Sequence, residues 1–192
     1  MIHIYSQKRN GVWFTVAVNE RRRLVGCNFS NESRLKAEKS IKAAIPPKQT
    51  ITHGLPKAEG RTIMDNLYRA YLGRASGPKK LDFLDNVSEF RRKVYLQLCR
   101  IPRGKVTTYG AIAKKLGSKK QSRAVGTAVA TNPISLIIPC HRVLPSTLRV
   151  GNYGMPGKDP TEGGPIKHAL LKREGVKFIE EKVAKECVWS PN

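Results

Sequence analysis

Three short, mostly apolar runs of strand-forming residues cover residues 2–5, 12–18 and 24–29 at the start of the chain. Such runs, bounded by turn residues, predict strands. Turn-forming residues stand between the runs, at Asn10-Gly11 and at 19–22. Such short connections join antiparallel neighbours, so the pattern predicts a small antiparallel sheet.

Two helices are expected after these strands, over about 33–44 and 62–72. Pro46-Pro47 would prevent continuation of the first helix, and Gly73 suits the end of the second. Residues 76–80 read Ser-Gly-Pro-Lys-Lys and form the expected linker. We therefore expect an α+β protein with an N-terminal domain over 1–80, ribonuclease H-like in its sheet and helices, and a mostly helical domain over 81–192.

The segment that follows Val106 has the period of an amphipathic helix. Apolar or small residues recur at i, i+3, i+4 and i+7, as Tyr109, Ile112, Ala113 and Leu116. Thr107 or Thr108 can cap the start of this helix, and Gly117 suits its end. After a short basic link, a second helix is expected from about 121 to 131, before Asn132-Pro133. Two helices joined by a short basic turn indicate a helix-turn-helix.

The second helix of this pair has few side chains that could read bases. A helix in the major groove uses Asn, Gln, Arg or Lys to reach base edges, but small residues dominate here after Arg123. Small side chains permit close approach to a minor groove, and they also suit tight packing on a neighbouring helix. Arg123, at the start of the helix, is the side chain that could enter a base stack.

The charge of the chain favours nucleic acid as the partner. The sequence has 36 Lys and Arg against 14 Asp and Glu, a formal net charge of +22. Residues 90–158 contain no acidic residue, and they include the predicted helix pair. A basic stretch without acids attracts phosphates. The alternative is a lysine-rich surface kept for solubility or heat resistance, but the second of these normally adds Glu as well.

The most informative motif is an apolar run that ends in Pro139-Cys140-His141-Arg142. A thiol reacts as the thiolate, and a neighbouring imidazole or cation favours that form. For an isolated Cys-His pair, a buried structural cysteine is the more common explanation.

Taken together, these motifs resemble the O6-alkylguanine-DNA alkyltransferase family. The resemblance extends from about Asp85 to Phe178 and is much weaker before it. Its motifs occur in the family's order, as Arg123-Ala124-Val125-Gly126, Asn132-Pro133, Pro139-Cys140-His141-Arg142 and Gly151-Asn152-Tyr153. The resemblance implies a DNA repair protein that transfers an alkyl group from O6-alkylguanine in duplex DNA to its own cysteine, irreversibly and once.

The resemblance also implies roles for single residues. Cys140 would accept the alkyl group, and His141 with Glu174 would form the proton relay. Tyr109 would help to rotate the base and supply a proton to the leaving guanine. Arg123 would occupy the space that the base leaves. The remaining contacts to DNA would come from small residues of the same helix, namely Ser122, Ala124, Gly126 and Thr127.

Asn132 would tie the recognition helix to the active-site turn. The segment from Val143 to Tyr153 would wall the pocket, with Val143, Val150, Tyr153 and Gly154 as its pocket residues. Many relatives have serine where this chain has Gly154, so the side-chain bond to O6 would be absent. The following loop, 155–165, is longer than usual and rich in Gly and Pro. Both departures concern the range of alkyl groups.

Other function classes have weaker support. A non-catalytic protein that binds alkylguanine lesions would lack the cysteine, and a cysteine hydrolase would need an oxyanion hole that nothing in the sequence indicates. The Cys and His spacings do not suit a metal site, so neither metal nor cofactor is expected, although a disulfide of Cys27, Cys99 or Cys187 stays open. Without a spanning apolar run or a signal-peptide pattern, we expect a cytoplasmic, nucleoid-associated monomer.

Overall fold

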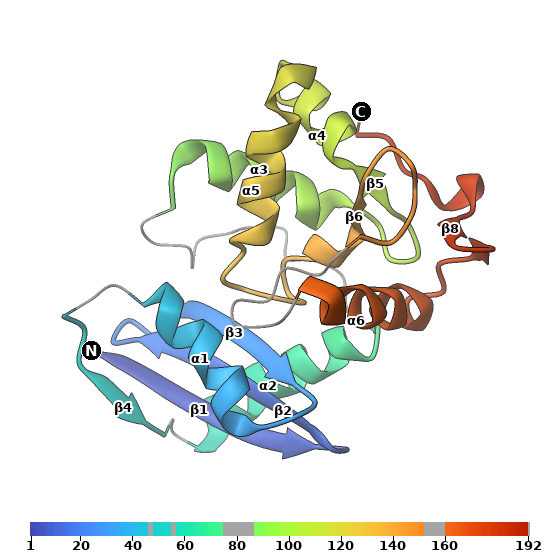
Figure 1. Cartoon of the computed structure of the whole chain (residues 1–192). Helices are drawn as coiled ribbons and strands as arrows, with labels where there is room; N and C mark the ends of the chain where they lie inside the picture. The colour runs from blue at the N-terminus through green and yellow to red at the C-terminus, as the bar shows by residue number, and fades with distance from the viewer. Residues whose placement is uncertain (46–47, 55–56, 75–86, 152–159, 192) are drawn as a thin grey trace.

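A computed structural model of the chain describes residues 1–45, 48–54, 57–74, 87–151 and 160–191. The expected linker at 76–80 lies outside these ranges. Within them the chain forms a mixed α+β structure with a small sheet and several helices, as expected (Figure 1).

The N-terminal sheet has the strand order β3-β2-β1-β4. The three expected strands are present as β1 (Ile2–Arg9), β2 (Val12–Asn19) and β3 (Leu24–Ser30), and they are antiparallel. A fourth strand, β4 (Ile51–His53), was not expected and pairs with β1 in parallel, so the sheet is mixed and not purely antiparallel. Three residues are too few for a run of strand-forming residues to be recognised.

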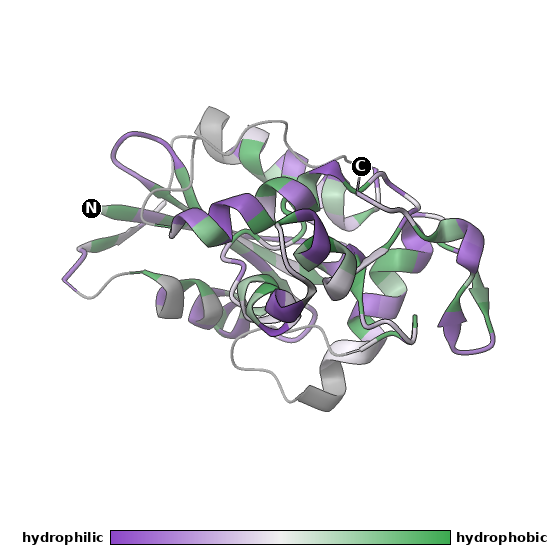
Figure 2. Ribbon diagram, turned by 90° about the horizontal axis from the view of Figure 1, so that it is seen from above, coloured by the Kyte–Doolittle hydropathy of each residue, from purple (hydrophilic) through white to green (hydrophobic). Residues whose placement is uncertain are grey.

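Helices cover both faces of this sheet, which explains why β2 is buried along almost its whole length. α1 (Arg34–Ala44) lies over the face that carries Ile4 and Ala17, to which it adds Ile41. α2 (Lys57–Tyr71) covers the opposite face, where Phe14 meets Tyr71 edge to face. Side chains of one strand alternate between the two faces, so β2 supplies both layers. The helices in Figure 2 carry both hydrophilic and hydrophobic stretches, as this packing requires.

The C-terminal part is mostly helical. α3 (Glu89–Arg100), which was not among the expected helices, is followed by α4 (Tyr109–Lys115) and α5 (Ser122–Ala130), which a single 3₁₀ turn (Lys119–Gln121) separates. The Thr108 hydroxyl caps α4 by accepting a hydrogen bond from Ala111 N, which confirms one of the two expected caps. Gly117 takes a positive φ of 111° just after the helix, as its position predicts.

α6 (Pro160–Arg173) is the last α-helix in the described ranges and lies below β6 in the view of Figure 1. Its start corrects the expected loop at 155–165, because the chain is already helical from Pro160. A proline in the first turn lacks only an N–H that has no helical partner anyway. A hairpin of β7 (Phe178–Ile179) and β8 (Lys182–Val183) follows, and then a 3₁₀ turn (Lys185–Cys187).

One hydrophobic core runs through both parts of the molecule. It joins residues of β2, β3 and α2 to residues of α3, α4 and α5, and it also includes Cys140. The backbone connects the two parts as well, because Cys27 in β3 forms a parallel bridge with Ile134. Cys27 N donates to Pro133 O at 2.9 Å, and Ser135 N donates to Cys27 O at 3.3 Å. The edge of the sheet is thereby tied to the segment that leads to Cys140.

Among the described residues, no helix is both long and apolar enough to cross a membrane.

Candidate functional site

Cys140 lies where a short strand pair meets a tight turn. β5 (Thr107–Thr108) pairs in parallel with β6 (Val143–Leu144), which places the start of α4 beside the residues that follow Cys140. Cys140, His141 and Arg142 form one turn of 3₁₀ helix, so their side chains point in different directions. Cys140 is 6% exposed, and its sulfur is close enough to interact electrostatically with Tyr109 and Lys167.

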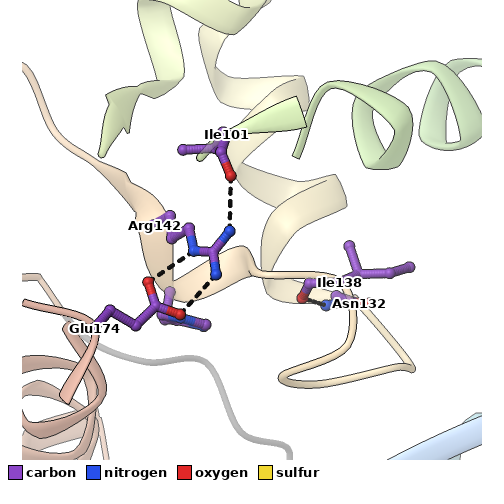
Figure 3. A network of polar contacts seen from close by, with 6 residues as sticks. Ile101, Asn132, Ile138, Arg142 and Glu174 are labelled. Carbon is purple, nitrogen blue, oxygen red and sulfur yellow. Dashed lines mark hydrogen bonds and ion pairs between the residues drawn. The ribbon is translucent and has the colours of Figure 1, made fainter. Parts of the chain in front are cut away.

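His141 and Arg142 both bind the carboxylate of Glu174, which follows the last residue of α6. His141 Nε2 lies 2.9 Å from Glu174 Oε1. Arg142 donates from Nε to Oε2 and from Nη2 to Oε1, each at 2.7 Å, and from Nη1 to Ile101 O at 2.7 Å (Figure 3). All three side chains are at most 2% exposed. The geometry brings together Glu174 and His141, which the family resemblance placed in one relay.

The charges in this group are set by burial and by the mutual hydrogen bonds. Burial alone would raise the pKa of the Glu174 carboxyl, but the hydrogen bonds from His141 and Arg142 outweigh it and lower that pKa to about 2. Glu174 is therefore an anion that can only accept. Burial lowers the pKa of His141 more than Glu174 raises it. The imidazole is therefore neutral at pH 7 and donates its Nε2–H to Glu174.

This arrangement leaves the second ring nitrogen of His141 as a hydrogen-bond acceptor. With the proton on Nε2, Nδ1 carries a lone pair. Nδ1 is fully buried, and within the described part of the chain it has no hydrogen-bond partner. A buried neutral imidazole with a free lone pair, next in sequence to a cysteine, has the properties of a general base for the thiol.

Tyr109 and Asn132 both lie near the Cys140 turn. Tyr109 is the first residue of α4, and burial together with nearby Cys140 raises the pKa of its phenol. The Asn132 amide follows α5 and donates to Ile138 O at 2.9 Å, two residues before Cys140 (Figure 3). Its oxygen accepts from Ile134 N at 3.0 Å. The Asn132 side chain thus joins the end of α5 to the Cys140 turn.

The outward face of α5 carries the expected small residues. Val125, Ala128 and Val129 are buried, whereas Arg123, Ala124 and Thr127 are exposed. Gly126 lies on this face, and a Cβ there would meet nothing within 4 Å. Close packing on another helix therefore does not explain Gly126. Tyr95 of α3 holds the end of the helix, since its hydroxyl donates to Ala128 O at 3.1 Å.

The expected pocket residues are only partly described. Tyr153 and Gly154 lie outside the described residues. Val143 is fully buried in the main core, and Val150 packs against a smaller core that includes Val106 and Leu144. The stretch just before residue 151 is attached to the C-terminal hairpin, because Val183 N donates a hydrogen bond to Leu148 O at 3.0 Å.

Comparison with known proteins gives a match over this same part of the chain. Residues 89–176 match the family model of the 6-O-methylguanine DNA methyltransferase, DNA binding domain. The matched residues begin with α3 and include α4, α5, the Cys140 turn and Glu174. This part of the chain is thus similar to that methyltransferase domain.

Curated relatives of the chain carry the name methylated-DNA–protein-cysteine methyltransferase. The chain is 44% identical over 88 residues to one from Methanosarcina acetivorans, which covers 46% of this chain and 52% of the relative. It is 47% identical over 91 residues to one from Saccharolobus islandicus, covering 47% and 54%. The chain thus spans about half the length of the curated relatives it matches.

Solved structures resemble the chain over nearly its whole length. The O6-methylguanine methyltransferase of Mycobacterium tuberculosis is 27% identical with a TM-score of 0.62, covering 91% of this chain and 93% of that one. The O6-methylguanine-DNA methyltransferase of Pyrococcus kodakaraensis is 25% identical with a TM-score of 0.65, covering 92% and 100%. The M. tuberculosis OGT protein in complex with DNA is 25% identical with a TM-score of 0.61, covering 90% and 92%.

Two buried cations at this site, Arg142 and Lys167, were not among the expected site residues. Arg142 neutralises Glu174 from a fully buried position. Lys167 on α6 is 1% exposed and donates to Val143 O at 2.7 Å, and burial lowers its pKa to about 8. It is therefore still a cation at pH 7. A signal for Lys167 existed, because Lys167, Leu170, Leu171 and Glu174 stand at i, i+3, i+4 and i+7 on one helix face.

Within the described ranges, no three His, Cys, Asp or Glu side chains are grouped so that they could hold a metal ion.

Proposed function

We propose that this chain is a single-turnover DNA alkyltransferase that moves the alkyl group of O6-alkylguanine onto Cys140. One observation carries the proposal: the neutral, buried His141 is held by Glu174 and keeps a free acceptor nitrogen, and the adjacent residue is a cysteine. Two of the other thiols, those of Cys27 and Cys99, are poorer candidates. Burial raises the pKa of Cys27 strongly and that of Cys99 to about 12.

The proposed step is a direct displacement. His141 Nδ1 accepts the thiol proton, directly or through water, and Glu174 and Arg142 hold the ring while it becomes cationic. The sulfur then forms a bond to the alkyl carbon as the bond from that carbon to O6 breaks. Tyr109 supplies a proton to the leaving guanine, and the Lys167 ammonium favours the negative thiolate. Alkyl and proton transfer balance the step, so it needs neither redox chemistry nor a cofactor.

The second element of the proposal is DNA recognition by α4 and α5 as a helix-turn-helix. The exposed, small-residue face of α5 would approach the minor groove, with contacts from Ser122, Ala124, Gly126 and Thr127. Arg123 stands exposed at the start of α5, where it can fill the space of a flipped base. The acid-free stretch from 90 to 158 supplies the positive field that attracts the duplex.

The finer assignments follow from the same proposal. The pocket for the flipped guanine would be lined by Tyr153, Gly154, Val143 and Val150. The Asn132 side chain would keep the Cys140 turn fixed relative to the end of α5. The ribonuclease H-like character of the N-terminal sheet and the domain division at 80/81 stay predictions. So do a monomeric state in the cytoplasm and association with the nucleoid.

Intact-mass measurement after incubation with a duplex that contains O6-methylguanine tests the proposal. We expect a gain of one CH₂ on the peptide that holds Cys140, in stoichiometric amount and without further turnover. Cys140→Ser should show no gain and still bind duplex DNA, because phosphate contacts lie elsewhere. Cys99→Ser is the matched control and should react like the parent.

The alternatives predict other results. A protein that only binds the lesion would leave its mass unchanged while retaining affinity for the damaged duplex. A cysteine hydrolase would turn over acyl substrates repeatedly and keep its original mass. Equal transfer by Cys140→Ser and the parent would remove Cys140 from the acceptor role.

A further inference from the structure

The N-terminal part contains no reactive group of the proposed site, yet it touches the residue that holds His141. α2 ends at Tyr71, and the chain then turns through Gly73, which has a φ of +69°. This turn lies directly against the backbone that joins Arg173 to Glu174. Two independent contacts form the junction, one through backbone atoms and one through side chains.

The backbone contact leaves no room for a side chain at Gly73. A Cβ there would lie 2.7 Å from Arg173 O, 2.8 Å from Arg173 C and 3.0 Å from Glu174 N. Real Cβ atoms do not approach backbone atoms so closely, so any side chain would push one segment away. On the other flank of Glu174, a Cβ on Gly104 would lie 3.3 Å from Glu174 O. The backbone of Glu174 is therefore confined between two glycines.

The side-chain contact is a cation–π pair between the same elements. The Arg173 guanidinium carbon lies 4.1 Å from the centre of the Tyr71 ring. Tyr71 is 7% exposed and meets Phe14 and Phe29 edge to face, with both pairs of ring centres 5.2 Å apart. Arg173 is thus attached to a rigid aromatic group of the sheet layer. Because Arg173 precedes Glu174, this attachment restrains the carboxylate as well.

We propose that Gly73 and Arg173 are positioning residues, through which the N-terminal part fixes Glu174 and thereby the orientation of the His141 ring. This inference rests on the proposed function, in which His141 is the base that takes the proton of the Cys140 thiol. A glutamate that moves away from Nε2 would no longer select the tautomer whose Nδ1 accepts a proton. A shift of about 1 Å at a catalytic group can cost on the order of a hundredfold in rate.

The test measures how fast Cys140 is alkylated by iodoacetamide as a function of pH, with peptide mapping to isolate Cys140 from the other thiols. Charged groups that face His141 are Glu174 and Lys167 of the α6 segment and Arg142 of its own turn, and none of them is changed. We expect the rate at pH 7 to fall about threefold in Arg173→Met and about tenfold in Gly73→Ala. The difference in alkylation rate between variant and parent should become smaller at about pH 9, where thiols ionise without a base.

Matched controls separate positioning from general damage. Gly11 has a φ of +81°, and a Cβ at this position would meet nothing within 4 Å, so Gly11→Ala carries the backbone strain without the clash. Lys172→Met removes the same charge as Arg173→Met from the neighbouring exposed residue, and Arg173→Lys restores the cation over the ring. Gly11→Ala and Lys172→Met should keep the profile of the parent, and Arg173→Lys should recover part of the rate.

Variants that melt earlier but keep the parental pH profile would overturn the proposal, because the contacts would then serve stability alone. If Gly73→Ala does not fold, the series at Arg173 decides the question. Transfer from O6-methylguanine duplex is measured in parallel. Shifted iodoacetamide profiles in a protein that takes no alkyl group from DNA would support the positioning role while refuting the proposed function.

Discussion

Replacing Glu174 with glutamine removes one charge from the centre of a buried group and changes little else in shape. The carboxylate accepts hydrogen bonds from His141 and twice from Arg142. An amide has a single acceptor oxygen, and its NH₂ group would face donors. The Glu174→Gln variant would therefore leave the buried Arg142 guanidinium without its counter-ion, which is the costly way to break a buried pair.

The size of the effect follows from the pKa of Glu174. Its value falls from 4.5 to about 2 in the folded protein. By linkage this shift corresponds to about 3 kcal/mol of stability at pH 7. Loss of one partner from a buried ion pair costs roughly 3–5 kcal/mol in other proteins, which agrees in size. For a chain of this length we expect Tm to fall by roughly 6–12 °C.

The pH dependence has a definite sign. The pKa of Glu174 is lower in the folded than in the unfolded chain, so its contribution is complete above pH 4.5 and is lost as the pH falls toward 2. Burial also lowers the pKa of His141, so acid below pH 6.5 favours the unfolded chain through that residue too. Glu174→Gln should lack that part of the parent's loss of stability between pH 4.5 and 2 which Glu174 contributes.

Urea unfolding, followed by tryptophan fluorescence at several pH values from about 7 to about 2, measures the loss of stability and its dependence on pH. Glu181→Gln is the control, because that carboxylate pairs with Arg149 at a surface position where it is 78% exposed. An exposed pair contributes little to the free energy of unfolding. A Glu174→Gln variant as stable as Glu181→Gln, or one that keeps the parental slope below pH 4.5, would refute the reasoning.

Three further predictions concern DNA and the reacted protein. Arg123→Ala should slow transfer from duplex DNA far more than reaction with free O6-benzylguanine, since a free base needs no flipping; equal losses in the two rate measurements would argue for a role in folding. Gly126→Ala should raise stability by about 1 kcal/mol in thermal melts, because the site is helical and open, yet weaken duplex binding in fluorescence anisotropy; unchanged binding would place this face away from DNA. Methylation of Cys140 should lower Tm, because one added methyl in a tight core costs ~1–3 kcal/mol, and an alkylated protein that melts at or above the free one would contradict the steric argument.

The sequence predicted those parts of the fold that local patterns specify. Apolar, strand-forming runs located β1 to β3, and helical periodicity with its caps located α4, where Thr108 and Gly117 act as expected. The stop at Asn132-Pro133 located the end of α5. The sequence patterns missed β4, whose three residues are too few for a pattern, and the pairing of β5 with β6, which joins residues far apart in the chain. Non-local pairing leaves no periodic signal in either partner.

The site divides in the same way. Cys140 and His141 are neighbours in sequence, and the resemblance supplied Glu174, whose contact with His141 the structure contains. Lys167 was missed because a lysine in a helix is normally read as solvent-exposed, and only its place among apolar neighbours indicated burial. The contact of Gly73 with Arg173 could not be predicted, since it depends on how α2 and α6 meet in space.

The continuous hydrophobic core implies that an alkyl group on Cys140 would change the stability of the whole protein. Cys140 shares that core with residues of the sheet, α2, α3 and α5, and Cys27 and Ile134 link the two parts through their backbones. Strain at one sulfur in such a structure is not confined to a local opening but shifts the balance between the native and the globally unfolded chain. An alkyl group that costs ~1–3 kcal/mol would multiply the unfolded population roughly five- to 150-fold. Proteases that cleave unfolded chains would then remove spent molecules faster than fresh ones, without any receptor for the alkylated cysteine.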